Sequence, residues 1–479
     1  MKLLITTPQT GFIKELAEVA AIFFGQVILT EAANEAQLKV IHSEDIRGQE
    51  RYCTVSIEGL YAHQISNSEI VLEEEIANKR MHKRQVKNAL YQALKRSVGS
   101  QPPWGSLTGI RPTRLVYEAM SQGISLEDAL KFIRETFDVI PVKAELLGQV
   151  IRSQQKMKPA AANEVDVYIG IPFCESRCRY CSFISSQVGN RSKIVPYTDA
   201  LVHEIHQMIQ LIHSRGFKIR AFYMGGGTPT ALDAELLDKV LTAASPILCA
   251  CYEKTVEAGR PDSITKERLH VLQKHHIGRI SINPQTIHDK SLEIIGRRHT
   301  HAQTQAAYEL ANSMGFEHIN MDLIAGLPGE TVDMFKQTLS WAREIAPQSL
   351  TVHSLCVKRS SEMHRWQDSL PEASAVEEMV SLGLESALSM GMEPYYLYRQ
   401  KHMAGNLENV GYALPDMACL YNVDTMEDTV SILAMGAGGI SKRVTPRRDM
   451  VYRAPNVKEI DCYIERIDEL IERKRKLWS

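Results

Sequence analysis

Between residues 165 and 355, short apolar runs rich in β-forming residues alternate with longer stretches of helical periodicity. The expected strands are 165–171, 220–224, 254–258, 278–283, 318–324 and 349–355, and the expected helices between them are 197–215, 234–245, 263–275, 301–314 and 331–344. Six βα units in series predict an α/β fold with a parallel sheet and right-handed crossovers, either doubly wound or curved into a partial TIM-like barrel. In both architectures, ligands bind at the carboxyl ends of the strands.

The chain of 479 residues is too long for one ordinary domain. Residues 1–152 predict an N-terminal α+β accessory domain, with strands at 2–7, 37–43 and 51–58 and helices at 72–96, 113–122 and 125–137. The polar run 153–164 predicts a linker. The barrel would then occupy residues 165–371. Residues 372–479 predict a mainly helical C-terminal extension, which would end in an amphipathic helix and could cover a bound substrate.

The composition is that of a water-soluble globular protein, with 44% apolar and 23% charged residues. The formal net charge of −2 provides no bulk attraction to nucleic acid or to an anionic membrane, so neither partner is expected. The most apolar window, residues 19–29, is too short to span a bilayer, and the N-terminus resembles a first strand rather than a signal peptide. We therefore expect a cytoplasmic protein whose nine cysteines are mostly thiols or metal ligands.

Three of these cysteines, Cys174, Cys178 and Cys181, lie close together directly after the first expected barrel strand. Three thiolates at this spacing can bind three irons of a cubane cluster and leave the fourth iron open to a substrate. Structural zinc would need a fourth ligand, for which His203 or His206 would have to fold in, and a chance group of buried cysteines is a further alternative. The position after a strand favours iron. The six other cysteines are expected to be small buried residues.

The pattern CxxxCxYC of residues 174–181 resembles the signature of the radical S-adenosylmethionine (SAM) superfamily. This resemblance implies a partial (β/α)6 barrel, a [4Fe–4S] cluster and bound SAM. It further implies that the cluster donates an electron to SAM, which yields methionine and a 5′-deoxyadenosyl radical.

The resemblance also assigns roles to residues at the ends of the later strands. The glycine-rich segment would hold the methionine end of SAM, because glycines let the backbone approach a ligand closely. Arg297 would bind the SAM carboxylate, and the remaining polar residues its ribose or amino group. The full expected set is Gly225, Gly226, Gly227, Thr228, Glu257, Gln285, Arg297 and Asp322.

Three longer motifs, at residues 168–174, 225–230 and 322–328, are similar to those of the oxygen-independent coproporphyrinogen III oxidases. The match extends over residues 165–441. The segments 109–114 and 398–412 are similar to the longer, HemZ-type branch of coproporphyrinogen dehydrogenases. In this group Tyr168 would lie beside the cluster.

The resemblance implies an oxidoreductase of haem biosynthesis. It would convert two propionates of coproporphyrinogen III to vinyl groups by oxidative decarboxylation, giving protoporphyrinogen IX. A tetrapyrrole with four propionates needs cationic partners, for which Arg399 and Lys401 are the main candidates and Arg111 and Arg114 are further ones. The expected electron donor is a protein such as flavodoxin or ferredoxin.

Two positions depart from the pattern of that group. Gly170 stands where the group has a histidine, and Phe183 stands where it has a fourth cysteine. These residues are linked in the group to a proton-relay or radical-path role and to a second SAM. A second SAM and the identity of the tetrapyrrole therefore stay open.

Two alternative functions remain. Some relatives keep the cluster motif but act as haem-binding chaperones, with a His-Asn pair before an aromatic residue near the C-terminus. Residues 406–412 contain no histidine, although His402 is near, which disfavours the chaperone. Another radical SAM reaction on a tetrapyrrole, such as methylation and opening of a haem ring, is the second alternative.

Overall fold

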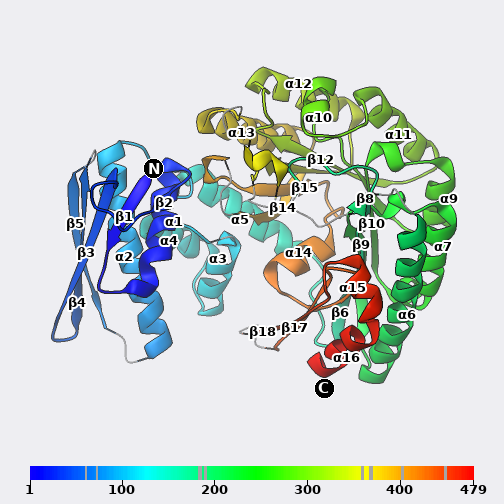
Figure 1. Ribbon diagram of the computed structural model, residues 1–479, viewed down its shortest axis with the longest axis horizontal. Helices are drawn as coiled ribbons and strands as arrows, with labels where there is room; N and C mark the ends of the chain where they lie inside the picture. Colours follow the sequence, from blue (N-terminus) through cyan, green and yellow to red (C-terminus); the bar gives the residue numbers. More distant parts are fainter. Residues whose placement is uncertain are drawn as a thin grey trace. The chain divides into compact units, whose positions relative to one another are not determined.

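The computed structural model describes residues 1–59, 62–71, 74–109, 111–181, 186–187, 191–357, 361–365, 370–400, 404–446 and 450–479. The chain forms two compact units (Figure 1). The first comprises residues 1–148 together with 398–408, and the second comprises residues 149–397 and 409–479. Among the helices in these described ranges, none combines the length and the apolar character needed to cross a bilayer.

The first unit is built on a five-stranded sheet in the order β2-β1-β3-β4-β5. Its strands are β1 (Lys2–Thr6), β2 (Ile28–Leu29), β3 (Leu38–Arg47), β4 (Glu50–Gly59) and β5 (His63–Ile70). The helices α1 (Ile13–Phe24) and α2 (Glu75–Val98) pack on one face of the sheet (Figure 1). Alternate residues of β4 are buried beneath them, because successive side chains of a strand point to opposite faces.

The rest of the first unit is helical. It contains α3 (Pro112–Ser121) and α4 (Leu126–Phe137), close to the predicted bounds, and most of α5 (Pro141–Lys156). Ser125 caps α4 by accepting a hydrogen bond from the Asp128 amide. The predicted linker was wrong at its beginning, because α5 continues to Lys156 with an apolar stripe that includes Leu147 and Val150.

Residues 398–408 add a distant part of the chain to the first unit. The buried Glu408 carboxylate accepts hydrogen bonds from Trp104 Nε1 at 2.7 Å and from Lys143 Nζ at 2.5 Å. This ion pair has almost no contact with solvent, so both charges depend on each other for compensation.

The second unit contains an eleven-stranded sheet in the order β14-β15-β13-β12-β11-β10-β9-β6-β16-β17-β18. The six predicted barrel strands are all present and run parallel: β6 (Glu164–Ile171), β9 (Lys218–Gly226), β10 (Glu253–Gly259), β11 (Arg279–Ile282), β12 (His318–Ala325) and β13 (Ser349–Ser354). The strand order is linear, so the described part of the sheet is open rather than a closed barrel. The prediction of a partial TIM-like α/β barrel is confirmed.

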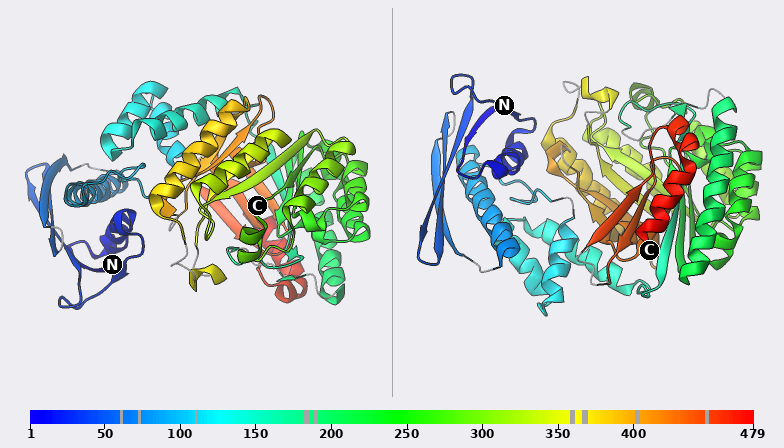
Figure 2. Two further views of the ribbon diagram at one scale, coloured as in Figure 1. Left: turned by 90° about the horizontal axis from the view of Figure 1, so that it is seen from above. Right: turned by 60° about the horizontal axis from the view of Figure 1, so that its bottom comes forward.

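The crossover helices form an outer layer on this sheet (Figure 1 and Figure 2). They are α6 (Arg191–Arg215), α7 (Ala234–Ala243), α8 (Ser245–Ala250), α9 (Lys266–Lys274), α10 (Asp289–Ile294), α11 (His301–Ser313) and α12 (Val332–Ile345). Several begin at a capping residue, such as Thr300, whose side chain forms a reciprocal capping box with Gln303.

The C-terminal extension contains the predicted helices but also five strands of the same sheet. Its elements are α13 (Ala373–Ser389), β14 (Glu393–Tyr398), β15 (Asn409–Ala413), α14 (Leu420–Glu427), β16 (Ser431–Met435), β17 (Ile440–Val444), β18 (Val451–Pro455), α15 (Ile460–Glu465) and α16 (Ile467–Leu477). Strand β16 pairs in parallel with β6, and β15 pairs antiparallel with β13. The extension therefore completes both edges of the barrel sheet.

A buried ion pair attaches the C-terminal helix to the barrel. Lys474 on α16 contacts the Glu204 carboxylate on α6, and both side chains are fully buried. The same carboxylate accepts hydrogen bonds from Tyr463 Oη at 2.6 Å, Asn456 Nδ2 at 3.0 Å and the Gly436 amide at 2.8 Å. Glu204 therefore joins four parts of the C-terminal extension to one barrel helix.

We expect Lys474→Ala to lower the free energy of unfolding of the second unit by about 3 kcal/mol, because it leaves a buried carboxylate without its cation. Urea unfolding followed by circular dichroism would measure the change. Lys476→Ala, at an exposed position of the same helix, is the matched control. The paired variant Glu204→Leu/Lys474→Met should recover most of the loss. A loss below about 1 kcal/mol for Lys474→Ala would contradict the assigned role.

Candidate active site

The three clustered cysteines lie on one loop at the carboxyl end of β6. Cys174 ends the short strand β7 (Phe173–Cys174), which pairs with β8 (Ser186–Gln187). Cys178 is buried, and Cys174 and Cys181 are half-buried. The Arg179 amide donates to the Ile295 carbonyl at 2.9 Å, and the Cys181 amide donates to the Cys178 carbonyl at 3.1 Å. We call residues 174–181 the cluster loop.

Polar groups contact two of the thiols. Arg260 Nη1 lies 3.5 Å from Cys178 Sγ and donates to the Ser176 carbonyl at 3.1 Å. Thr228 Oγ1 lies 3.5 Å from Cys174 Sγ. A guanidinium and a hydroxyl at these positions stabilise negative charge on sulfur, as the surroundings of a metal-bound thiolate do.

The glycine segment of residues 225–227 packs directly against the chain that leads into the cluster loop. The Gly227 amide donates to the Ile171 carbonyl and the Thr228 amide to the Phe173 carbonyl, each at 2.7 Å. A Cβ added at Gly227 would lie 2.5 Å from the Phe173 carbonyl oxygen, and one added at Gly225 would lie 2.7 Å from the Glu257 carboxylate. The segment therefore has no room for side chains and exposes backbone where a ligand would approach.

Two carboxylates follow on β10 and β12, the strands on either side of β11. Glu257 on β10 accepts a hydrogen bond from Tyr223 Oη, and burial raises its pKa to about 7. Burial also opposes ionisation of Asp322 on β12, but His353 and Asn320 outweigh it and hold the pKa of Asp322 below its usual value. His353 Nε2 lies 3.7 Å from Asp322, and Asn320 Nδ2 donates to the carboxylate at 2.9 Å.

Gln285 and Arg297 each carry a buried polar atom without a hydrogen-bond partner among the described residues: Oε1 of Gln285 and Nε of Arg297. Gln285 has a left-handed backbone, with φ of 68°, and its amide donates to the Asp322 carbonyl at 3.0 Å. The two η nitrogens of Arg297 donate to the Asn283 carbonyl at 2.9 Å and to Tyr180 Oη at 3.1 Å. Because buried polar atoms are nearly always paired, these two positions fit a polar ligand.

Three tyrosine rings lie nearly parallel on the inner side of the sheet. The ring centroids of Tyr223 and Tyr421 are 4.4 Å apart, and those of Tyr168 and Tyr421 are 6.0 Å apart. Burial raises the pKa of Tyr168, so its hydroxyl stays protonated. Sequence reasoning found Tyr168 but missed Tyr223, Tyr421 and His353. Tyr421 comes from α14, far along the chain, and lies in no motif.

The structure brings together the cysteines, the glycine segment and the strand-end polar residues of the second unit. Arg399 belongs to the first unit, where its guanidinium donates to the Leu107 and Asn406 carbonyls at 2.8 and 2.9 Å. Burial lowers its pKa to about 10. Lys401 lies outside the described residues. Arg114 pairs with Glu118 on an exposed helix face. The substrate roles predicted for Arg399 and Lys401 stay predictions.

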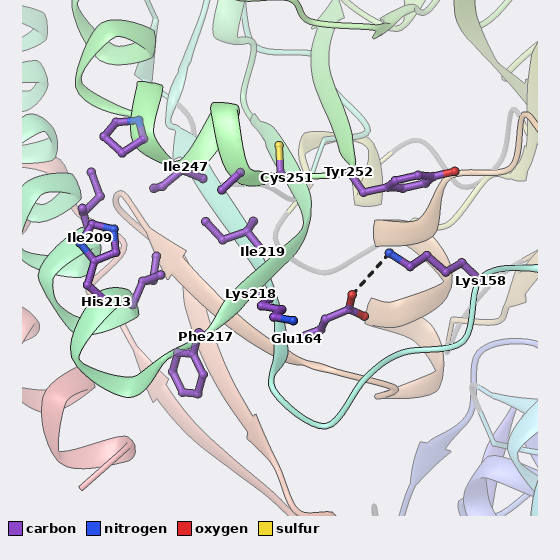
Figure 3. A pocket seen from close by; sticks show the side chains of 13 residues that line it. Lys158, Glu164, Ile209, His213, Phe217, Lys218, Ile219, Ile247, Cys251 and Tyr252 are labelled. Carbon is purple, nitrogen blue, oxygen red and sulfur yellow. Dashed lines mark ion pairs between the residues drawn. The ribbon is translucent and has the colours of Figure 1, made fainter.

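A cavity of about 450 Å³ lies at the opposite end of the barrel strands (Figure 3). Its lining includes Glu164 and Lys218, the first residues of β6 and β9, and Glu164 pairs with Lys158 at 3.5 Å. The cluster loop and the glycine segment instead follow the last residues of these strands. The cavity is therefore not part of the candidate active site.

Comparison with known proteins identifies the family. A model described as the Radical SAM superfamily matches residues 168–342. The oxygen-independent coproporphyrinogen-III oxidase-like protein HemZ of Bacillus subtilis (strain 168) is 38% identical over 408 residues, which are 82% of this chain and 81% of the relative. The heme chaperone HemW of the same organism is 32% identical over 236 residues, which are 48% of this chain and 61% of the chaperone.

The solved structures give the same fold. The coproporphyrinogen III oxidase HemN of Escherichia coli, described as a radical SAM enzyme, matches with a TM-score of 0.51 at 22% identity, over 68% of this chain and 72% of that chain. Radical SAM proteins use a [4Fe–4S] cluster and SAM, which are the cofactors expected from the resemblance of residues 174–181 to the superfamily signature. The chain belongs to the radical SAM superfamily and, within it, to the family of oxygen-independent coproporphyrinogen-III oxidase-like proteins.

Proposed function

We propose that this protein is a radical SAM enzyme that converts two propionates of coproporphyrinogen III to vinyl groups, giving protoporphyrinogen IX. One structural observation carries the proposal: the cluster loop and the glycine segment follow the carboxyl ends of β6 and β9, and the acids Glu257 and Asp322 lie on β10 and β12 of the same barrel. The similarity to the HemZ protein over most of both chains supports the substrate class.

The residues at the carboxyl ends of the barrel strands fit a [4Fe–4S] cluster and SAM. Cys174, Cys178 and Cys181 would each bind one iron of the cluster. The unpartnered Nε of Arg297 suits the SAM carboxylate, because a buried guanidinium lacking one acceptor gains a charge-assisted hydrogen bond there. Glu257 would accept hydrogen bonds from the ribose hydroxyls.

The cofactors would supply a primary carbon radical that removes one hydrogen atom from the carbon next to the pyrrole ring in a propionate. Release of CO₂ and of one electron to an acceptor then leaves a vinyl group, so each propionate consumes one SAM. An iron–sulfur or flavin protein, such as ferredoxin or flavodoxin, would supply the electron that starts each cycle.

The chain's own contribution is orientation and exclusion of water. The stacked rings of Tyr168, Tyr223 and Tyr421 form an apolar wall on the inner side of the sheet. Gly170 carries no group that could relay a proton, and its carbonyl accepts a hydrogen bond from Tyr197 Oη at 2.6 Å. The nearby titratable pair on the inner side is instead His353 with Asp322.

A haem-binding chaperone is the second candidate. The local identity of 32% to the heme chaperone HemW favours it, although that match covers 61% of the chaperone. Stable binding of haem by the purified protein, without conversion of porphyrinogen, would select the chaperone over the enzyme.

Anaerobic turnover tests the proposed reaction. The reconstituted protein is mixed with SAM, a reductant and coproporphyrinogen III, and 5′-deoxyadenosine and tetrapyrrole mass are followed. We expect deoxyadenosine together with loss of two CO₂ per tetrapyrrole. Cys178→Ala should abolish both products, and Cys249→Ala, at an exposed cysteine of α8, should not. Deoxyadenosine with unchanged porphyrinogen would reject the substrate, and a gain of a methyl group would indicate a different tetrapyrrole reaction.

Gly225→Ala tests the glycine segment as the SAM cradle. Its Cβ would lie 2.7 Å from the Glu257 carboxylate, so either this carboxylate or the segment must move, and the contacts offered to SAM change. We expect SAM affinity, measured by equilibrium dialysis, to fall at least about tenfold while iron content stays unchanged. Gly278→Ala, where a Cβ meets nothing within 4 Å, is the control. Equal SAM affinity in Gly225→Ala and Gly278→Ala would show that the glycine segment does not hold SAM.

The raised pKa of Glu257 predicts a pH dependence of SAM binding. The carboxyl is neutral below its pKa of about 7 and ionised above it, and the ionised form accepts hydrogen bonds more strongly. SAM affinity should therefore rise with pH, by about tenfold between about pH 6 and pH 8, following the ionised fraction. Titration calorimetry of the wild type and Glu257→Gln measures this. The same pH dependence in both proteins would show that Glu257 does not contact SAM.

A further inference from the structure

Four potential metal ligands meet inside the first unit: His42, Glu44, Cys53 and His82. His42 and Glu44 lie two residues apart on β3, so they share one face of the sheet. Cys53 on β4 is the direct cross-strand partner of Glu44. His82 comes from α2, the helix that packs on this face (Figure 1). The group is therefore enclosed between sheet and helix.

The geometry of the four groups suits one ion. One nitrogen from each histidine, one Glu44 oxygen and the Cys53 sulfur all lie within 4.8 Å of one another. Ligands of tetrahedral zinc, at bond lengths of about 2.0–2.3 Å, are about 3.3–3.8 Å apart, so small side-chain rotations would close the site. Exposure is 2% for His42, 0% for Cys53 and 6% for His82.

His42 Nε2 is buried and has no hydrogen-bond partner among the described residues. It lies 4.0 Å from Glu44 Oε2, and His82 Nε2 contacts the same oxygen at 2.6 Å. Buried polar atoms are rarely left unpaired. An ion between these groups would give the His42 nitrogen a partner.

In His42 and Glu44, the polar atom that faces away from the group contacts a neighbouring side chain. Thr7 Oγ1 lies 2.9 Å from His42 Nδ1, and Gln9 Nε2 donates to Glu44 Oε1 at 2.6 Å. These bonds fix the imidazole and the carboxylate with their second atoms directed at the group. Metal-binding histidines and carboxylates have supporting partners of this kind.

The Cys53 thiol donates to Gln85 Oε1 at 2.9 Å. Cysteine binds zinc as a thiolate, so metal binding would release this proton.

We propose that the first unit binds one zinc ion through His42, Glu44, Cys53 and His82. Two imidazoles and a thiolate select zinc over magnesium or calcium, which take oxygen ligands. Four protein ligands at a site closed to solvent indicate a structural ion that stabilises this unit and does not catalyse. The proposal is independent of the reaction assigned to the barrel.

Zinc content of the full-length protein tests this site. The cluster cysteines can also take zinc, so the measurement uses both the reconstituted protein and a background with Cys174, Cys178 and Cys181 replaced by alanine. Mass spectrometry of the metals should find about one zinc per chain in both. His82→Gln and Cys53→Ser should each reduce zinc to below about 0.2 per chain, and His63→Gln, on the neighbouring β5, should retain it.

Cobalt substitution and heat unfolding add independent readouts. In the alanine background, Co²⁺ should give visible bands of tetrahedral geometry and a near-ultraviolet sulfur-to-cobalt band that Cys53→Ser removes. Thr7→Val should weaken zinc affinity by about 10–100-fold.

A chelator should lower the Tm of the first unit by at least about 5 °C in the wild type but not in His82→Gln. Zinc-free protein that does not bind added Zn²⁺, or zinc retained in all the ligand variants, would overturn the site.

Discussion

The backbone contact between the end of β9 and the cluster loop fixes the distance between the two halves of the candidate active site. The Gly227 and Thr228 amides donate to carbonyls of the chain that leads into Cys174, and neither contact leaves room for a larger residue at position 227. A cluster on the loop and a ligand on the glycine segment would therefore be held at one spacing by main-chain atoms. The backbone thus sets the positions of both groups, and side chains such as Glu257 and Arg297 add further contacts to the ligand.

The amino ends of the barrel strands carry buried ion pairs. At the strand starts, the buried Arg220 donates to Asp424 at 2.7 Å, and Arg279 contacts Glu253 at 3.1 Å. These pairs join β9 to α14 and β11 to β10. The charge of each arginine is therefore balanced by an acid inside the protein. The open, partly unpaired polar atoms of Gln285 and Arg297 lie beyond the carboxyl ends. The two arginines at the strand starts are thus paired with acids of the protein, although the buried Asp166 nearby keeps one oxygen, Oδ2, without a partner among the described residues.

The sequence predicted the barrel well because its evidence is local. Each of the six parallel strands is a short apolar run between helical patterns, and the cysteine and glycine motifs follow two of them directly. Features without a local apolar pattern, and features that depend on distant pairing, were missed. Strand β5 was not predicted because its sequence is largely polar and half exposed, and β16 joins β6 across most of the chain. Tyr421 and His353 lie in no recognisable motif, and only the folding of the chain brings them to the site. Cys53 resembles an ordinary buried cysteine until the register places it beside Glu44.

Because residues 398–408 are part of the first unit, this unit depends on a segment that is synthesised late. Glu408 supplies the buried acceptor for Trp104 and Lys143, yet it emerges from the ribosome after all six parallel barrel strands. Until then, the Lys143 ammonium and the Trp104 indole have no acid to bind. The N-terminal unit therefore cannot reach its final core before the barrel is almost completely translated. A fragment that ends at residue 148 would also lack the segment that closes it, and deletion of residues 1–148 would leave residues 398–408 without the surface they pack on.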